Sequence, residues 1–171
     1  MKKITFILFV AIISLSLSQI ASAQISVGGG LAYGTNIEEI GIQVGGTYVL
    51  NEEMRVGGDF IYWLTESNEF ADVTFFEINA NFNYIFFEEE DLVIYAIGTL
   101  GLHRASVDSN VDLGGFGGFD VSSSETELGL GVGAGLEYDL GSVLLYVEPR
   151  LFLSGFDQLS LAAGARIPIN N

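Results

Sequence analysis

Apolar and polar residues alternate with a strict period of two from residue 126 to residue 138. The even positions are mostly apolar, whereas the odd positions are glycine or glutamate. Successive side chains of a β-strand point to opposite faces, so this segment has one apolar face and one face almost without side chains. Glycine packs nothing in a strand interior and loses much backbone entropy. The glycines at 129, 131, 133 and 135 therefore indicate either a close approach by another group or the lining of a narrow barrel.

The same alternation recurs along the chain in runs bounded by short polar segments, and no helical period of comparable length is present. In the run at 92–104, either set of alternate residues can form the apolar face. We prefer the assignment that places Thr99, Gly101 and His103 on the polar face. Runs of this kind predict an all-β chain of antiparallel, up-and-down strands. The eight predicted strands are 25–33, 39–50, 54–65, one around 76–86, 92–104, 126–138, 143–154 and 158–169.

The breaks between the runs are of two kinds. Tight polar turns at 51–53, 88–91 and 139–142 alternate with longer breaks, of which 105–124 is the longest. That segment is rich in serine, aspartate and glycine, which predicts a mobile loop. Pro149 lies inside the seventh run, where it cannot donate a hydrogen bond to a sheet, so we expect a local bulge there.

The first residues have the composition of a secretory signal. Lys2 and Lys3 precede an apolar run that ends near Leu17, and small residues at 21 and 23 stand just before Gln24. The run is shorter than the roughly 20 residues that a spanning helix needs, which disfavours a membrane anchor. We therefore expect a cleaved signal peptide at 1–23 and one domain at 24–171.

The charge and hydropathy of the predicted mature domain point in different directions. Removing the two signal lysines from six basic residues leaves four arginines against 22 acids, a net charge of −18. This charge disfavours nucleic acid as a partner. Yet 49% of all residues are hydrophobic and the mean hydropathy is +0.44. Both facts fit a barrel whose apolar face contacts lipid while its acids lie in turns, loops and lumen.

A soluble ligand-binding barrel with an apolar interior is the alternative arrangement of the two faces. An eight-stranded barrel encloses only enough space for side chains or one small ligand, so most of the apolar residues do not fit inside. The other face lacks lysine and is rich in Gly, Asn, Ser and Thr, which makes a poor soluble surface. Outward aromatic residues next to the tight turns fit an interfacial girdle: Tyr48, Tyr84, Phe86 and Tyr138. We expect these turns, and both termini, to be periplasmic.

Seven charged residues occupy the inward positions of the predicted strands. Three arginines among four acids can pair, and an unpaired charge in a narrow lumen would be costly. We therefore predict a structural network that plugs the lumen; a proton or ion path is the alternative. The seven residues are Arg55, Asp59, Glu77, Glu137, Glu148, Arg150 and Arg166.

Other candidate chemistry has weaker support in the sequence. His103 is the only histidine, and with Ser106 and Glu125 or Glu127 it could form a nucleophile, base and acid set. Nothing in the spacing is specific, so we expect no catalytic residues and no enzymatic activity. The acids Asp108, Asp112 and Asp120 could bind a divalent cation, but their spacing matches no calcium loop. We therefore expect no metal and no cofactor.

The complete pattern resembles the small outer-membrane β-barrel proteins often labelled porin-family. The likeness rests on the signal, eight alternating strands, the segment Gly-Leu-Gly-Val-Gly-Ala-Gly-Leu-Glu-Tyr and the closing Leu-Ala-Ala-Gly-Ala-Arg-Ile-Pro-Ile. It implies a monomeric protein of the Gram-negative outer membrane, in contact with lipid and lipopolysaccharide and inserted by the barrel-assembly machinery. The last strand resembles the signal that the barrel-assembly machinery reads, except that it is followed by Asn170 and Asn171 rather than by a terminal aromatic residue. The implied role is structural or surface-interacting, with a narrow channel or a lipid-modifying enzyme as alternatives.

Overall fold

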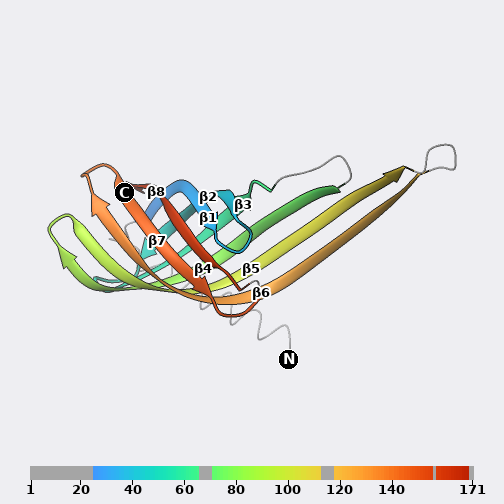
Figure 1. The fold of residues 1–171 in the computed structure, drawn as a ribbon. Coiled ribbons are helices and arrows are strands. Elements are labelled where there is room, and N and C mark those ends of the chain that lie inside the picture. Colours follow the sequence, from blue (N-terminus) through green and yellow to red (C-terminus); the bar gives the residue numbers. More distant parts are fainter. Residues whose placement is uncertain (1–24, 66–70, 113–117, 156, 170–171) are drawn as a thin grey trace, which may run out of the picture.

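Eight antiparallel strands form one closed barrel in the computed structural model (Figure 1), which describes residues 25–65, 71–112, 118–155 and 157–169. The strands follow one another round the barrel in chain order, and β1 closes the ring by pairing with β8. This confirms the predicted all-β, up-and-down barrel. The strands are β1 (Ile25–Gly34), β2 (Glu39–Val49), β3 (Met54–Trp63), β4 (Ala71–Glu89), β5 (Leu92–Asp112), β6 (Gly118–Asp139), β7 (Leu144–Phe152) and β8 (Leu159–Ile169).

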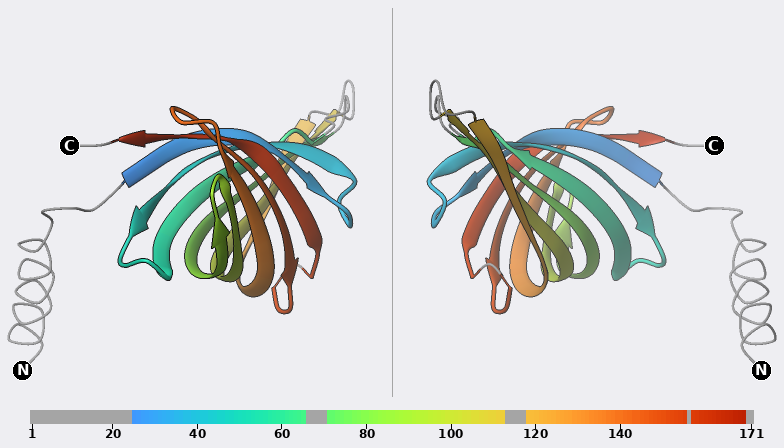
Figure 2. Two further views of the ribbon diagram at one scale, coloured as in Figure 1. Left: turned by 90° about the vertical axis from the view of Figure 1, so that its left-hand side faces the viewer. Right: turned by 90° about the vertical axis from the view of Figure 1, so that its right-hand side faces the viewer.

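The start of β1 and the end of β8 lie side by side, because Ile25 pairs with Ile169 (Figure 2). They share this end of the barrel with the tight turns that follow β2, β4 and β6, so we call it the turn end. The predicted signal peptide lies outside the described residues. Within the described ranges, no helix is long and apolar enough to cross a membrane.

The two faces of the strands are arranged as their alternation predicts. Apolar side chains such as Leu31, Leu128 and Leu130 are exposed on the outside, whereas polar side chains such as Gln43 and Glu148 are buried inside. The ambiguous fifth run has the preferred phase: Thr99 and His103 are buried and Leu100 is exposed. The outer surface of the barrel is therefore apolar, and its interior holds polar side chains together with apolar ones such as Ile61 and Trp63.

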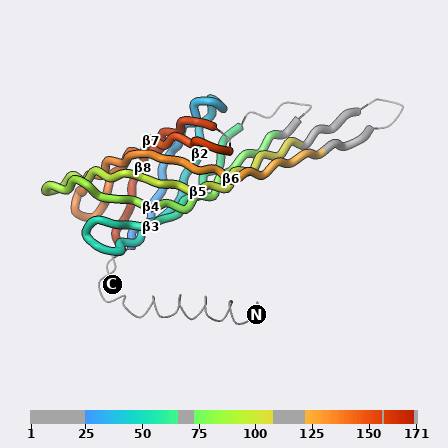
Figure 3. The backbone as a smooth tube through the Cα atoms, turned by 90° about the horizontal axis from the view of Figure 1, so that it is seen from below, coloured from blue at the N-terminus to red at the C-terminus, as the bar shows by residue number. Residues whose placement is uncertain are grey.

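The prediction of a mobile loop at 105–124 is wrong. Strands β5 and β6 remain paired as far as Asp112 and Gly118, so most of this segment is a β-hairpin. With β4, these strands are 19, 21 and 22 residues long and extend beyond the rest of the barrel (Figure 3). Each added pair continues a ladder that the barrel has already formed, which offsets the weak strand preference of the serines and aspartates. We call the opposite end of the molecule the hairpin end.

The bulge that we expected at Pro149 is also wrong. The pairs Gly133–Arg150 and Leu136–Val147 have the same register, so β7 contains no extra residue at this point. The ladder between β6 and β7 is instead interrupted opposite Pro149, while its pairing with Leu161 of β8 continues. The N–H that proline lacks is thus accommodated by a local gap in the ladder between β6 and β7. A register shift does occur in β4, between Ile85 and Phe87.

Candidate functional site

A continuous chain of ion pairs crosses the barrel interior. Arg150 contacts Asp59 at 2.7 Å and Glu148 at 2.5 Å. The other oxygen of Glu148 is 2.5 Å from Arg166, which also contacts Glu137 at 3.1 Å. Glu137 ends the chain by accepting a hydrogen bond from Arg55 at 2.7 Å. Six of the seven predicted charged residues therefore form one linked set.

The arrangement follows from the strands that carry these residues. Four strands, β3, β6, β7 and β8, contribute one or two charges each, all at inward positions of the alternation. Arginine and carboxylate alternate along the chain of contacts, so each acid has at least one cation beside it. In an interior of low dielectric, this pairing is what keeps the buried charges from being strongly destabilising.

Two tyrosines and a group of amides extend the ion-pair chain. The hydroxyl of Tyr95 donates to Glu148 at 2.6 Å and accepts from Arg166 at 3.2 Å. The guanidinium of Arg166 also lies 3.9 Å from the ring centroid of Tyr146, a cation–π contact. Asn79 and Asn81 donate to the two oxygens of Asp59. The asparagines of β4 thus form a hydrogen-bonded inner face.

Glu77 is buried apart from these ion pairs. Its carboxylate accepts hydrogen bonds from the indole of Trp63 at 3.0 Å and from the amide of Gln158 at 2.7 Å. Asn79 adds a third, longer contact at 3.4 Å. None of the ion pairs found in the described residues includes Glu77. Neutral donors therefore hold Glu77, and Asn79 links it by hydrogen bonds to Asp59 of the ion-pair chain.

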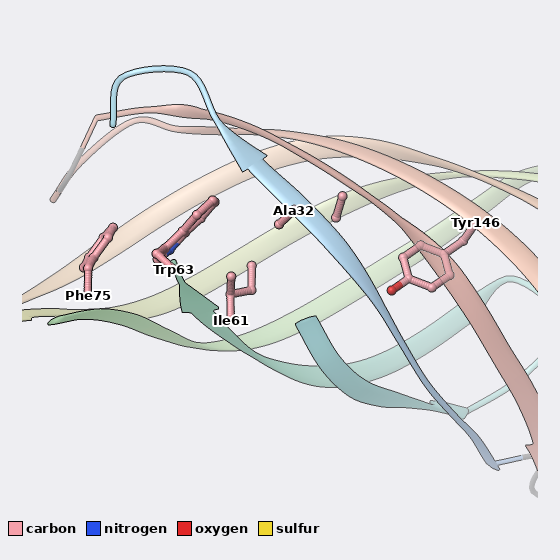
Figure 4. Close-up of a cluster of buried hydrophobic side chains, with 6 residues drawn as sticks. Ala32, Ile61, Trp63, Phe75 and Tyr146 are labelled. Atoms are coloured by element: carbon pink, nitrogen blue, oxygen red, sulfur yellow. The ribbon is translucent and has the colours of Figure 1, made fainter. Parts of the chain in front are cut away.

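An apolar cluster fills the interior near the hairpin end (Figure 4). Trp63 stacks on Phe75 with ring centroids 6.1 Å apart, and Ile61 and Ala32 lie beside them. Trp63 is completely buried. This cluster lies on the hairpin side of the ion-pair chain, so the interior contains both a polar layer and an apolar layer.

Only small spaces remain between these side chains. A polar cavity of about 20 Å³ lies among Gln43, Asp59, Asn83 and Arg150, which is room for about one water molecule. A second space of about 150 Å³ lies at the turn end, where Arg55 forms part of its wall. The two spaces share a wall at Thr47, whose hydroxyl is hydrogen-bonded to Ser26 at 2.7 Å.

The inward glycines of β6 provide room for rings and chains of the neighbouring strands. A Cβ built on Gly135 would lie 2.2 Å from the ring of Tyr95, and one on Gly131 would lie 3.1 Å from the ring of Phe152. A Cβ on Gly133 would lie 2.4 Å from the carbonyl oxygen of Pro149. The groups that need this space belong to the adjacent strands β5 and β7; a Cβ at Gly133 or Gly135 would overlap them, and one at Gly131 would be in tight contact.

Only part of the possible catalytic set comes together: His103 pairs with Glu127 across β5 and β6, whereas Ser106 is turned away. His103 is buried and packs edge-on against Phe152, with ring centroids 4.5 Å apart. Strand β5 continues through Ser106 without a register shift, so the odd and even positions place His103 and Ser106 on opposite faces. The acids of the possible cation site lie where side chains are outside the described part of the structure.

The outside of the barrel carries an apolar band between two sets of aromatic residues. Tyr62 and Phe76 form a cross-strand pair toward the hairpin end, and Tyr84 and Phe86 lie toward the turn end. The ten residue steps from Phe76 to Phe86 cover about 33 Å of strand, or about 25 Å in height at the usual tilt of barrel strands. That height matches the apolar band of outer-membrane barrels, about 25 Å.

Sequence reasoning missed several residues that hold the site together. Tyr95 is not among the predicted residues of the network, although its hydroxyl joins Glu148 to Arg166. Gln158 was placed at the edge of the last strand, and its contact with Glu77 bridges 81 residues of sequence. An inward tyrosine or glutamine facing inward acids is the signal that could have identified both.

Comparison with solved structures shows the fold. Ail, the attachment invasion locus protein of Yersinia pestis, aligns with a TM-score of 0.56 and 18% identity, over 86% of this chain and 97% of Ail. Neisserial surface protein A aligns with a TM-score of 0.56 and 23% identity, over 88% and 96% of the two chains. A major outer-membrane protein from Thermus thermophilus aligns with a TM-score of 0.58 and 10% identity, over 86% and 99%. No protein-family model and no curated protein sequence match the chain.

The chain therefore has the fold of the small eight-stranded outer-membrane β-barrels.

Proposed function

We propose that this chain is an integral protein of the bacterial outer membrane, with a plugged lumen and a role in surface interaction. The observation that carries the proposal is the combination of a filled polar interior with a hairpin that extends beyond the barrel. The apolar outer band, about 25 Å high, supports insertion in a membrane. In this proposal both termini are periplasmic and the hairpin end faces the cell exterior.

The plugged lumen is supported by the ion-pair chain and the apolar cluster. Between them, the polar cavity found among the described residues measures about 20 Å³, room for about one water molecule, which supports a lumen closed to ions. Purified protein in a planar bilayer should therefore give no stable conductance steps. Reproducible steps, in bilayers in which heat-sensitive gel mobility confirms folded protein, would favour the narrow channel instead.

The surface role is supported by the free edge of β6. Pairing with β7 begins at Gly131, and in the described ranges no strand pairs with 118–128 on that side. On the β7 side, the carbonyl of Leu130 accepts from the backbone N–H of Leu153, and its N–H donates to the hydroxyl of Ser154. Every second residue of a strand directs its backbone groups to the same side, so those of Ser122, Ser124 and Thr126 also point to this free edge. An extended segment of a partner protein can add to an edge of this kind.

Thiol labelling tests the orientation that this role requires. The chain has no cysteine, so Ser123→Cys and Ser142→Cys each introduce a single thiol, one in the hairpin and one in a tight turn. A membrane-impermeant maleimide should label Ser123→Cys on intact cells and should label Ser142→Cys only after permeabilisation. The reverse pattern would place the hairpin in the periplasm and would remove the surface role.

The remaining parts of the proposal concern partners and chemistry. Lipid and lipopolysaccharide surround the barrel, the barrel-assembly machinery inserts it, and it acts as a monomer without a cofactor. Catalysis is not part of the role, since His103 and Ser106 lie on opposite faces. Mass spectrometry of lipid A from cells with and without the protein tests this: an altered profile would support a lipid-modifying enzyme.

A further inference from the structure

Arg104 is the one arginine of the described strands that points away from the barrel interior. The other three belong to the ion-pair chain, and their guanidinium groups contact buried carboxylates. Arg104 occupies an even position of β5, on the same face as Leu100, and is exposed. None of the ion pairs among the described residues includes it.

The described outward side chains next to Arg104 are uncharged, although the sequence has 22 acids. Its direct cross-strand partners are Phe76 on β4 and Thr126 on β6. The outward residues two positions away along the three strands are also uncharged: Thr74, Ile78, Leu102, Ser106, Ser124 and Leu128. The positive charge of Arg104 is therefore not neutralised by these neighbours and is available to an anion.

The height of Arg104 is that of a membrane interface. It lies in one cross-strand row with Phe76 and Tyr62, which form the aromatic set toward the hairpin end. Aromatic residues of this kind lie at the level of lipid headgroups in outer-membrane barrels. A phosphate on a lipid headgroup is the anion expected at this level, and guanidinium binds phosphate with two parallel hydrogen bonds.

A shallow, open apolar hollow lies on the same outer surface, further toward the turn end. Gly98 and Ala80 line it, between the larger side chains of Phe82, Leu100 and Leu130. Gly98 is unlike the interior glycines, because a Cβ built there would meet nothing nearer than a carbonyl oxygen at 4.0 Å. Packing therefore does not require glycine at this position; its effect is to deepen the hollow.

We propose that Arg104 and this hollow form one binding site for the lipid A part of lipopolysaccharide. Gly98 and Arg104 are six residues apart on the same face of β5, or about 20 Å along the strand. A lipid whose phosphate contacts Arg104 extends its acyl chains along this face into the hollow. The choice of lipid A rests on the proposed orientation, since lipopolysaccharide occupies the outer leaflet at the hairpin end.

Binding of defined lipids to purified, folded protein tests the site. Native mass spectrometry in detergent should show lipid A retained by the unchanged protein and by Arg104→Lys, which keeps the charge. Arg104→Gln should bind lipid A about tenfold more weakly, as expected for loss of one hydrogen-bonded charge contact. Gly98→Leu should also weaken binding, because it fills the hollow. Heat-dependent gel mobility would confirm that each variant is folded.

Two results would overturn the inference. One is equal retention of lipid A by the unchanged protein and Arg104→Gln. The other is equal retention of phosphatidylglycerol and lipid A, which would show a site for any anionic lipid. These outcomes are separate from the test of orientation: the labelling of Ser123→Cys decides which end faces outward, whereas the lipid measurement uses purified protein and decides whether Arg104 and Gly98 select lipid A.

Discussion

Replacement of Gly135 by alanine should destabilise the barrel far more than the added methyl group suggests. The new Cβ would lie 2.2 Å from two ring carbons of Tyr95, whereas comfortable carbon–carbon contacts are about 3.5 Å, so the ring must move by about 1.3 Å. Tyr95 is fully buried, and its hydroxyl lies 2.6 Å from Glu148 and 3.2 Å from Arg166. Movement of the ring therefore breaks or stretches contacts of the ion-pair chain.

The expected loss has two parts. Overpacking of a filled interior costs about 1–3 kcal/mol, and a lost hydrogen bond to a charged group costs about 1.5–3 kcal/mol. We expect Gly135→Ala to lower the free energy of unfolding by about 3–5 kcal/mol. Urea unfolding of the barrel in lipid vesicles measures this change, with the fluorescence of the single buried tryptophan, Trp63, as the signal.

Two controls separate the contact with Tyr95 from a general effect of substitution in β6. Ala134→Val changes the next residue, which is exposed on the outside, and should alter stability by less than about 0.5 kcal/mol. In a Tyr95→Ala background the ring is gone, so Gly135→Ala should cost at least about 1 kcal/mol less than in the unchanged protein. An equal cost of Gly135→Ala and Ala134→Val would refute the assignment of the inner face as a filled lumen.

Three further changes test other parts of the structure by urea unfolding in lipid vesicles, followed by far-ultraviolet circular dichroism because one of them removes Trp63, the only tryptophan. Arg150→Met leaves Asp59 and Glu148 without their shared cation and should cost about 3–5 kcal/mol; a cost below about 1 kcal/mol would show that the ion-pair chain is not a buried unit. Trp63→Phe keeps an aromatic ring beside Phe75 but removes a donor to Glu77, which should cost about 1–3 kcal/mol; full stability would mean that this hydrogen bond is unimportant. Replacement of 107–123 by Asn-Gly joins the paired residues Ser106 and Ser124 through a two-residue turn and should leave a folded barrel; failure to fold would show that the hairpin is part of the barrel's stability.

The faces of the strands could be predicted because the information is local. A period of two assigns each side chain to one face without knowledge of its neighbours, and it placed Arg55, Asp59 and Glu137 in the interior. The same reasoning identified the tight turns. At the turn after β6, for example, Gly141 has a φ of 92° and Asp139 accepts a hydrogen bond from its backbone.

The extended hairpin could not be predicted in this way, because its stability comes from the ladder that it continues. Serine and aspartate at 106–110 indicate a loop when considered alone, yet each residue pairs in register with β6. The response to Pro149 likewise depends on both neighbouring strands, since one ladder is interrupted and the other is not. Such effects belong to the assembled sheet rather than to any single run.

The contacts between interior side chains could not be predicted from the sequence either. Alternation shows which face a side chain is on, but not its position along the barrel axis or how far it extends across the interior. Seven inward charges suggested one network, whereas Glu77 is held by Trp63 and Gln158 near the apolar cluster. The height at which each residue lies depends on the register between strands, and here the register brings residues together that are far apart in the sequence. For the same reason, the close approach of Gly135 and Tyr95 could not be predicted from the sequence.

Gel mobility of an outer-membrane fraction, with and without boiling, tests most directly the claim that this chain is an integral outer-membrane barrel. A closed barrel in which every strand is paired resists detergent until it is heated, so the unboiled protein should migrate differently from the boiled protein. The account predicts this shift in the membrane fraction. A chain that stays in the aqueous fraction, or that migrates identically before and after boiling, would contradict it.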